Sequence, residues 1–146
     1  MSAAALSSET VHASCVAVGD RAVLIGGRSG SGKSDLALRL IDRGARLVSD
    51  DYTLVRRVEG RLLAEAPANI AGKIEVRGLG ILEFEPVRDV AVALFVDLDE
   101  VPQRVPQENL GRTVAGLEVP VVGLAALEAS APLKVEAAIQ MLGLRL

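Results

Sequence analysis

The sequence predicts an α/β domain that is rich in β-structure and has few helices. Of the 146 residues, 50% are hydrophobic and only 2% are aromatic, so branched aliphatic side chains must form the core. A glycine-rich segment, residues 27–34, stands between a strand-like and a helix-like apolar run. The length fits one domain, and we expect residues 1–9 to be a flexible extension before a domain of residues 10–146.

The first half of the chain alternates short apolar runs with turn residues. Strands are predicted over residues 11–18 and 21–25, joined at the turn Gly19-Asp20. A helix follows the glycine-rich segment and ends before Gly44. Strands over residues 45–48, 52–58 and 61–66 come next, the last two joined at Glu59-Gly60.

The second half is predicted to contain more loops and a closing helix. Glycines interrupt short strand-like runs over residues 73–82, after a loop over residues 67–72. Residues 89–98 form the strongest candidate for a fully buried strand, and residues 99–111 form a polar loop. A helix is predicted over residues 131–142, with Ser130 as its N-cap and Gly143 after its end.

Charge and cysteine content exclude several classes of protein. The net charge of −3 and the absence of a long Lys/Arg run argue against nucleic acid or an anionic membrane as the partner. No apolar run has the length that crosses a bilayer. Because Cys15 is the single cysteine, an internal disulfide is excluded. We therefore expect a cytoplasmic protein that binds neither nucleic acid nor membranes.

The glycine-rich segment matches the phosphate-loop pattern Gly-x4-Gly-Lys-Ser. Its backbone N–H groups can surround phosphates, Lys33 can reach the β- and γ-phosphates, and Ser34 can place its hydroxyl on Mg²⁺. A Gly/Ser-rich turn could also simply join a strand to a helix, but chance matches occur in on the order of one such chain in two hundred. We therefore expect nucleotide phosphates to bind Gly27, Arg28, Ser29, Gly30, Ser31, Gly32, Lys33 and Ser34.

Two aspartates, Asp50 and Asp51, follow the next predicted strand. One carboxylate can hold a metal-bound water, and the other can accept a proton from an attacking hydroxyl, as phosphoryl transfer to a serine requires. A solvated acidic turn at a strand end explains the pair equally well from the residues alone.

Three blocks in this order resemble the catalytic domain of HPr kinase/phosphorylase. They are residues 27–34, Arg-Gly-Ala-Arg-Leu-Val-Ser-Asp-Asp at residues 43–51, and Glu-Val-Arg-Gly-Leu-Gly-Ile at residues 75–81. The third block is the most specific, because phosphate loops in general do not need it. The resemblance, which is strong over residues 12–82, implies a phosphate-loop domain of the HPr kinase/phosphoenolpyruvate carboxykinase-like type. It also implies a short form that consists of the C-terminal catalytic domain only.

The resemblance assigns roles to individual residues. Asp51 matches the family residue that accepts the serine proton, and Asp50 would support the metal or its water. Glu75 would share Mg²⁺ with Ser34, and Lys33 would contact the transferring phosphate. His12 stands where the family has an active-site histidine, a role that a lone histidine at a strand start would not otherwise suggest.

An arginine near the transferring phosphate could neutralise its charge. Arg104 matches the family's arginine, although the segment before it is shorter in this chain, and Arg112 is the competing candidate. The resemblance further implies ATP and Mg²⁺ as cofactors, a serine of an HPr-like phosphocarrier as acceptor, and a homo-oligomer, which is a hexamer in the family. The family's basic segment for the reverse, phosphorylase reaction is not recognisable at residues 119–123, so that activity stays open.

Other functions remain open. A generic phosphate-loop ATPase would use the acidic strand that ends at Asp97, with Asp99 or Glu100 activating water. A small-molecule kinase would need an arginine-rich lid, which is not clear in the sequence. A non-catalytic nucleotide-sensing module would bind the carrier without transferring phosphate, although the presence of both Asp51 and Glu75 argues against it.

Overall fold

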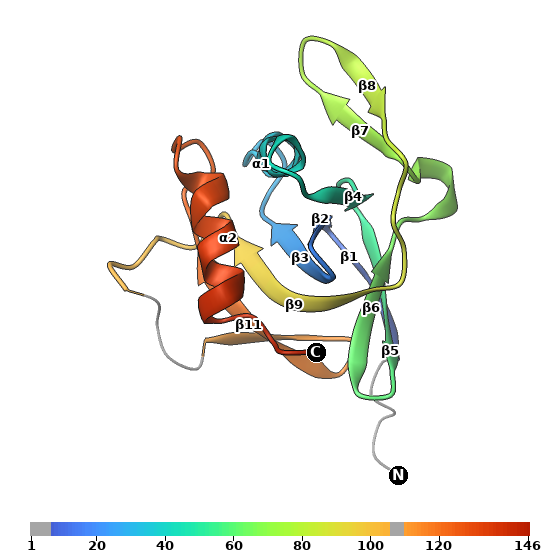
Figure 1. The fold of residues 1–146 in the computed structure, drawn as a ribbon, viewed down its shortest axis with the longest axis vertical. Coiled ribbons are helices and arrows are strands. Elements are labelled where there is room, and N and C mark those ends of the chain that lie inside the picture. Colours follow the sequence, from blue (N-terminus) through green and yellow to red (C-terminus); the bar gives the residue numbers. More distant parts are fainter. Residues whose placement is uncertain (1–6, 106–109) are drawn as a thin grey trace.

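A curved sheet forms the body of the molecule, and helices α1 (Lys33–Asp42) and α2 (Ala131–Met141) lie against one of its faces (Figure 1). The computed structural model describes residues 7–105 and 110–146. A 3-10 turn, η1 (Ala68–Ile70), precedes a small hairpin formed by β7 (Lys73–Val76) and β8 (Gly80–Glu83). The strands are β1 (Ser8–Val11), β2 (Ala13–Val18), β3 (Arg21–Gly26), β4 (Arg46–Ser49), β5 (Thr53–Val58), β6 (Arg61–Glu65), β7 (Lys73–Val76), β8 (Gly80–Glu83), β9 (Val90–Asp97), β10 (Gly111–Val114) and β11 (Leu117–Gly123).

Strand β9 lies at the centre of the sheet. It runs parallel to β3 on one side, and on the other it pairs with β6 near its start and with β11 near its end. Beyond β3 the sheet continues through β2 to β4, and beyond β6 it continues through β5 to β1. Both faces of β9 are covered, so apolar side chains are favoured on each face, and the strand is apolar at every residue before its last, Asp97.

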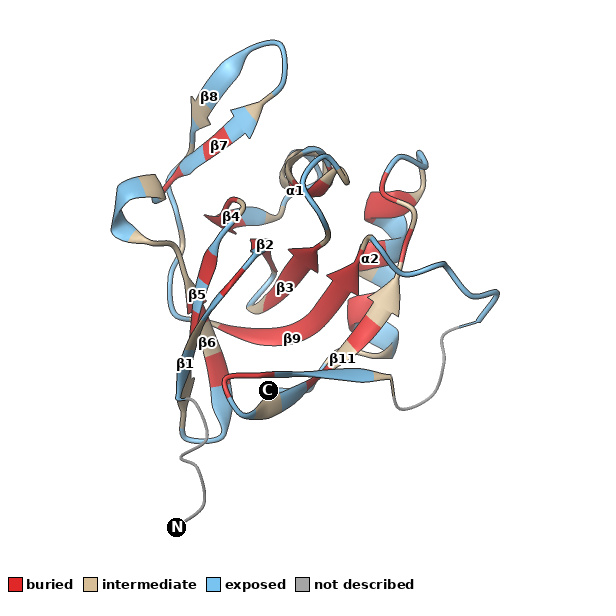
Figure 2. Cartoon of the chain, turned by 180° about the vertical axis from the view of Figure 1, so that it is seen from behind, coloured by how far each residue is buried: buried red, intermediate tan, exposed pale blue. Residues whose placement is uncertain are grey.

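Each face of the sheet buries its own apolar cluster. Side chains alternate along β3, so Val23 and Ile25 face the helices, whereas Leu24 faces the opposite side. Figure 2 shows the buried residues concentrated along β3 and β9. The helix side also includes Leu36, Leu40, Leu94, Val135 and Ile139, and the opposite side includes Val55, Val92, Phe95, Val114 and Val119. The carboxyl ends of the parallel strands β3 and β9 thus lie side by side at one edge of a rigid core.

Several element boundaries differ from the sequence-based predictions. Strand β1 begins at Ser8, inside the segment expected to be flexible, and the predicted strand 11–18 is two strands. The break falls at His12 because β1 pairs with β5, whereas β2 pairs with β3 and β4. Ser130 precedes α2 as predicted, but its side chain makes no capping hydrogen bond. The β10–β11 hairpin was not predicted.

The β7–β8 hairpin forms a separate two-stranded sheet that projects beyond α1 (Figure 1). Its inner residue Ile74 is fully buried in the cluster beneath the helices, which fixes the base of the hairpin. Its outer residues Leu79 and Ile81 are 77% and 64% exposed. Within residues 7–105 and 110–146, no helix has the length and apolar character needed to cross a membrane.

Candidate active site

The glycine-rich segment joins the end of β3 to the start of α1, as the sequence predicts. Gly26, the last residue of β3, pairs with Asp97, the last residue of β9, so the loop begins beside two parallel strand ends. Gly32 occupies the N-cap position of α1 with a φ of 101°, which is the left-handed region that favours glycine. A Cβ atom at Gly32 would also lie 3.1 Å from Ala126 Cβ. The backbone therefore needs glycine there to enter α1, and a helix N-terminus of this kind is suited to binding phosphates.

Lys33 is buried and spans the loop. Its Nζ donates to the carbonyl oxygens of Gly27 at 2.8 Å and Arg28 at 3.2 Å. The same Nζ lies 3.9 Å from Asp51 Oδ1. The ammonium group therefore lies between the phosphate loop and the carboxylate that sequence analysis selected as the proton acceptor.

The carboxylate of Asp50 joins three elements beside the phosphate loop. Asp50 Oδ1 accepts hydrogen bonds from Ser14 Oγ at 3.0 Å and from Ser34 Oγ at 2.6 Å. Asp50 Oδ2 accepts the backbone N–H of Glu75 at 3.1 Å. These bonds tie β2, α1 and β7 to one buried carboxylate, which explains why a charge is tolerated there.

Asp51 lies in a tight three-residue turn. The N–H of Tyr52 donates to the carbonyl of Asp50 at 2.7 Å, and the φ of Asp51 is 66°. The N–H of Asp51 donates to Ser14 Oγ at 3.0 Å. A positive φ in a residue other than glycine costs backbone energy, and such residues concentrate at functional sites. The turn presents the Asp51 side chain, which is 51% exposed, to solvent beside Lys33.

His12 and Lys33 approach the same oxygen of Asp51. His12 Nε2 lies 3.0 Å from Asp51 Oδ1, and the His12 side chain is 42% exposed. Among the described residues, Asp51 Oδ2 has no hydrogen-bond donor. One oxygen of the carboxylate is thus held by two cationic or donor groups, while the other can meet an incoming hydroxyl.

The chemistry of the donor set fits Mg²⁺. Ser34 and Asp50 supply hard oxygen atoms next to the phosphate loop, and the backbone of Glu75 is anchored to Asp50. The Glu75 side chain itself is exposed. Within the described part of the chain, no group of three or more His, Cys, Asp or Glu side chains could hold a metal ion alone. Mg²⁺ usually binds one or two carboxylates together with substrate phosphates, so such a cluster is not required.

Comparison with known proteins identifies the family. Residues 4–128 match the family described as the HPr Serine kinase C-terminal domain. The chain belongs to this family. A solved structure, that of the Hpr(Ser) kinase/phosphatase from Coxiella burnetii, superposes with a TM-score of 0.78 at 27% sequence identity and covers 91% of this chain and 89% of that chain. The β-rich α/β phosphate-loop fold is therefore confirmed as that of HPr kinase C-terminal domains.

Curated relatives of this HPr kinase-type chain are longer proteins. The HPr kinase/phosphorylase of Clostridium tetani is 47% identical over an alignment of 79 residues that covers 53% of this chain and 26% of that protein. The HPr kinase/phosphorylase of Chlorobium limicola is 38% identical over an alignment of 127 residues that covers 77% of this chain and 38% of that protein. The chain thus spans well under two thirds of the length of these relatives.

Neither candidate arginine contacts Asp51 in this HPr kinase-type domain. Arg104 is exposed, and Arg112 lies over the Phe95 ring, with its Cζ 4.1 Å from the ring centroid. Arg112 Nη2 also pairs with Asp97 Oδ2 at 3.0 Å. The choice between the two arginines for the active-site role stays a prediction.

Asp97, the acidic residue of the ATPase alternative, supports the phosphate loop. Its Oδ1 accepts the N–H of Asp99 at 2.9 Å, and its Oδ2 is bonded to Arg112. Asp99 Oδ2 in turn accepts the N–H of Arg28 at 2.9 Å. Both carboxylate oxygens of Asp97 are therefore bonded to protein groups. The Asp99 carboxylate accepts a hydrogen bond from the loop backbone, so in this arrangement it supports the loop and is not positioned to activate a water molecule.

Two residues of the site, Ser14 and Tyr52, are not evident from the sequence pattern. Ser14 lies fully buried in the apolar strand β2. A serine in such a strand is itself a signal, because its buried hydroxyl must have a hydrogen-bond partner. Tyr52 stacks on His12, with ring centroids 4.9 Å apart. No local pattern marks that contact.

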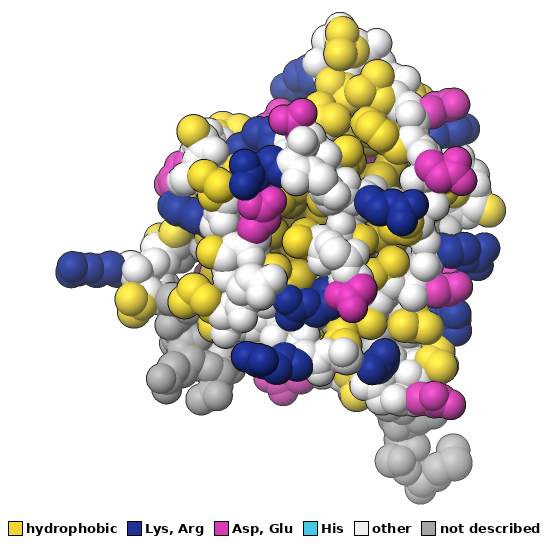
Figure 3. All heavy atoms as spheres, in the orientation of Figure 1, with side chains coloured by type: hydrophobic (Ala, Val, Ile, Leu, Met, Phe, Trp, Pro, Cys, Tyr) yellow, Lys and Arg dark blue, Asp and Glu magenta, His cyan; other side chains and the backbone are white. Residues whose placement is uncertain are grey.

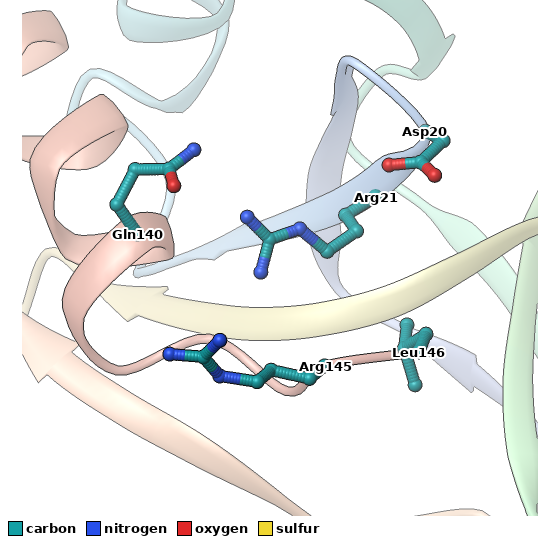
Figure 4. Close-up of a pocket in the computed structure, with 5 residues that line it drawn as sticks. All are labelled: Asp20, Arg21, Gln140, Arg145 and Leu146. Atoms are coloured by element: carbon teal, nitrogen blue, oxygen red, sulfur yellow. The ribbon is translucent and has the colours of Figure 1, made fainter.

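A groove elsewhere on the molecule does not belong to the site. It has a volume of about 260 Å³ and is lined by Asp20, Arg21, Gln140, Arg145 and Leu146 (Figure 4). Arg21 lies at the start of β3, the end opposite the phosphate loop. Its Nη1 donates to the carbonyls of Ile139 and Leu144, each at 3.2 Å, so this arginine holds the end of α2 in place.

Proposed function

We propose that this protein is an ATP- and Mg²⁺-dependent serine kinase whose acceptor is an HPr-like phosphocarrier protein. The observation that carries the proposal is the half-exposed Asp51 carboxylate, which Lys33 and His12 approach directly beside the phosphate loop. Family membership supports the same activity, because the relatives named HPr kinase/phosphorylase share this segment of the chain. A cytoplasmic location and a homo-oligomeric assembly are parts of the same proposal.

In the proposed reaction the phosphate loop, residues 27–34, holds the phosphates of ATP. The serine hydroxyl oxygen of the carrier forms a bond to the γ-phosphorus, and the bond from that phosphorus to the β–γ bridging oxygen breaks, which releases ADP. Asp51 accepts the hydroxyl proton, while His12 and Lys33 hold its carboxylate in place. Mg²⁺, when bound, would neutralise charge on the phosphates, and Ser34 and Glu75 would hold it with support from Asp50.

The surface near the site supports a protein as the acceptor. Leu79 and Ile81 expose most of their apolar area on the projecting hairpin, and Figure 3 shows hydrophobic side chains gathered over it. A small metabolite would not need such an apolar surface outside the phosphate site, whereas a folded carrier could bury it. The phosphorylase direction has weaker support, because the described residues 119–123 belong to β11 and include no basic side chain.

The decisive experiment measures the intact mass of an HPr-like carrier from the same organism after incubation with the protein and MgATP. A gain of one phosphate is expected on the carrier, and none on a carrier whose acceptor serine is changed to alanine. Asp51→Asn should lower the rate by about a hundredfold or more while keeping MgATP affinity, because it removes the proton acceptor. Lys33→Ala should instead weaken nucleotide binding itself.

Asp20→Asn is the matched control for charge, because Asp20 is exposed in the turn before β3, away from the phosphate loop. It should transfer phosphate at the wild-type rate. MgATP binding without any transfer to the carrier would overturn the kinase proposal in favour of the nucleotide-sensing alternative. Loss of transfer in Asp97→Asn with full activity in Asp51→Asn would favour the ATPase arrangement.

A further inference from the structure

Two aromatic rings meet at the edge of the candidate active site. The rings of His12 and Tyr52, which are the single histidine and the single tyrosine of the chain, have centroids 4.9 Å apart and an interplanar angle of 21°. Both residues are partly solvent-exposed: the His12 side chain is 42% exposed, and Tyr52 as a whole residue is 46% exposed. The core therefore does not enclose the imidazole, and the stacked phenol ring restricts the angle at which the imidazole can lie.

The backbone holds both ends of this stack. His12 lies between Val11, which pairs with Thr53, and Ala13, whose carbonyl accepts the hydroxyl of Thr53 at 2.8 Å. Tyr52 directly precedes Thr53, and the N–H of Tyr52 closes the turn at Asp51. A second bond runs from Ser49 Oγ to the carbonyl of Tyr52. The residue that carries the phenol ring is thus fixed opposite the residue that carries the imidazole.

We propose that Tyr52 is a positioning residue that holds the His12 imidazole with its Nε2 on Asp51 Oδ1 during phosphoryl transfer. The inference rests on the proposed kinase function. His12 Nε2 and Asp51 Oδ1 are 3.0 Å apart in this orientation, and rotation of the ring would break the contact. Asp51 Oδ2 then stays free of protein donors among the described residues and faces the acceptor hydroxyl. Tyr52 acts through His12 and needs no contact of its own with ATP or the carrier.

The first arm of the test uses NMR and requires no activity. Because His12 is the single histidine, its imidazole signals are assigned without ambiguity. A ring stacked on the imidazole shifts its carbon-bound protons upfield, and we expect this shift in the wild type and in Tyr52→Phe. Tyr52→Leu should lose this shift, and it should also lose the nuclear Overhauser contacts between the imidazole protons and the Asp51 side chain. Retention of the wild-type imidazole–Asp51 contacts in Tyr52→Leu would overturn the proposal, because another contact would then orient the imidazole.

The second arm measures transfer kinetics. Tyr52→Leu should lower kcat about tenfold, because a misplaced His12 imidazole no longer holds Asp51 in position for phosphoryl transfer. The KM for MgATP should stay unchanged. Tyr52→Phe, which keeps the ring and loses the hydroxyl, should restore kcat to within about twofold of the wild type. In a His12→Ala background, Tyr52→Leu should change kcat by less than about twofold, because the group that it positions is already absent.

Each other kinetic result contradicts the inference. Equal losses of kcat in the wild-type and His12→Ala backgrounds would mean that Tyr52 does not act through His12. A rise only in KM for the carrier would make Tyr52 a carrier contact. If the wild-type protein transfers no phosphate to any serine carrier, the proposed function fails, and the NMR arm still decides whether Tyr52 orients His12.

Discussion

The hydroxyl of Ser14 meets two groups of the candidate active site at once. It donates to Asp50 Oδ1 at 3.0 Å and accepts the N–H of Asp51, also at 3.0 Å. Ser14 is fully buried, so water could replace its hydroxyl as partner of the Asp50 carboxylate or the Asp51 N–H only if the sheet opened. A single side chain on β2 therefore stabilises both the buried carboxylate and the strained turn that presents Asp51.

Replacing Ser14 by alanine should destabilise the fold. Ser14→Ala leaves a carboxylate oxygen and a backbone N–H with one partner fewer in a buried place, which costs about 1–3 kcal/mol of unfolding free energy. Urea denaturation monitored by circular dichroism measures the change. Ser8→Ala is the matched control, because Ser8 is exposed on β1, and it should stay within about 0.5 kcal/mol of the wild type. Equal stabilities of the two variants would show that the Ser14 bonds contribute nothing.

The residues of the site divide into those that lie close in the sequence and those that do not. The phosphate loop follows a fixed pattern, and Asp50 and Asp51 are adjacent, so the sequence could predict them as a group. Ser14 and Asp50 are 36 residues apart and come together only when β2 pairs with β4. Their contact, like the stack of Tyr52 on His12, depends on tertiary pairing that no local pattern encodes.

At the scale of elements, β3 and β9 pack closely where the phosphate loop begins. A Cβ atom at Gly26 would lie only 2.4 Å from Cζ of Phe95. The Phe95 ring has little room to move away, because the guanidinium of Arg112 covers it and pairs with Asp97. The absence of a side chain at Gly26 is thus a packing requirement of the β3–β9 contact.

Gly26→Ala should therefore overpack this contact. We expect a loss of about 1–3 kcal/mol of unfolding free energy, and weaker MgATP binding because the loop entrance shifts. Thermal denaturation and nucleotide titration measure the two effects. Phe95→Leu in the same chain should recover part of the loss, although Phe95→Leu alone leaves a cavity and destabilises the protein. Purely additive losses in the double variant would contradict a clash between these two side chains.

Periodicity and turn residues placed most of the strands, and the failures have physical causes. Residues 11–18 are mostly apolar and contain no glycine or proline, so no turn signal marks the change of pairing partner at His12. The β10–β11 hairpin was missed because its charged residues, such as Arg112 and Glu118, interrupt the apolar pattern. Its inner side chains still fill the core, since Val114 and Val119 are buried beneath the sheet.

At the scale of the whole molecule, Cys15 reports on the integrity of the fold. It is fully buried on β2, and burial raises the pKa of its thiol, so the reactive thiolate is suppressed in the native state. Labelling by a thiol reagent should require unfolding. A nucleotide concentration of about one hundred times Kd should slow labelling about a hundredfold, because the proposed MgATP site exists only in the folded protein.

The control for Cys15 labelling is Asp20→Cys in a Cys15→Ala background, which places the thiol in the exposed turn between β2 and β3. This thiol should react at the rate of a free thiol with and without MgATP. Labelling of wild-type Cys15 at a comparable rate in the folded protein would contradict a closed core. A labelling rate that is slow and independent of MgATP would contradict the proposed nucleotide binding.

The central position of β9 has a consequence for how the protein is made. Strands β3 and β6 pair with β9 from opposite sides, yet β9 begins only at Val90. While the chain emerges from a ribosome, the earlier strands expose open sheet edges and an unfilled core until β9 has left the exit tunnel. The phosphate loop is synthesised before β9, but its supporting partner Asp97 is the last residue of β9. The proposed nucleotide site is therefore complete only after β9 has been translated.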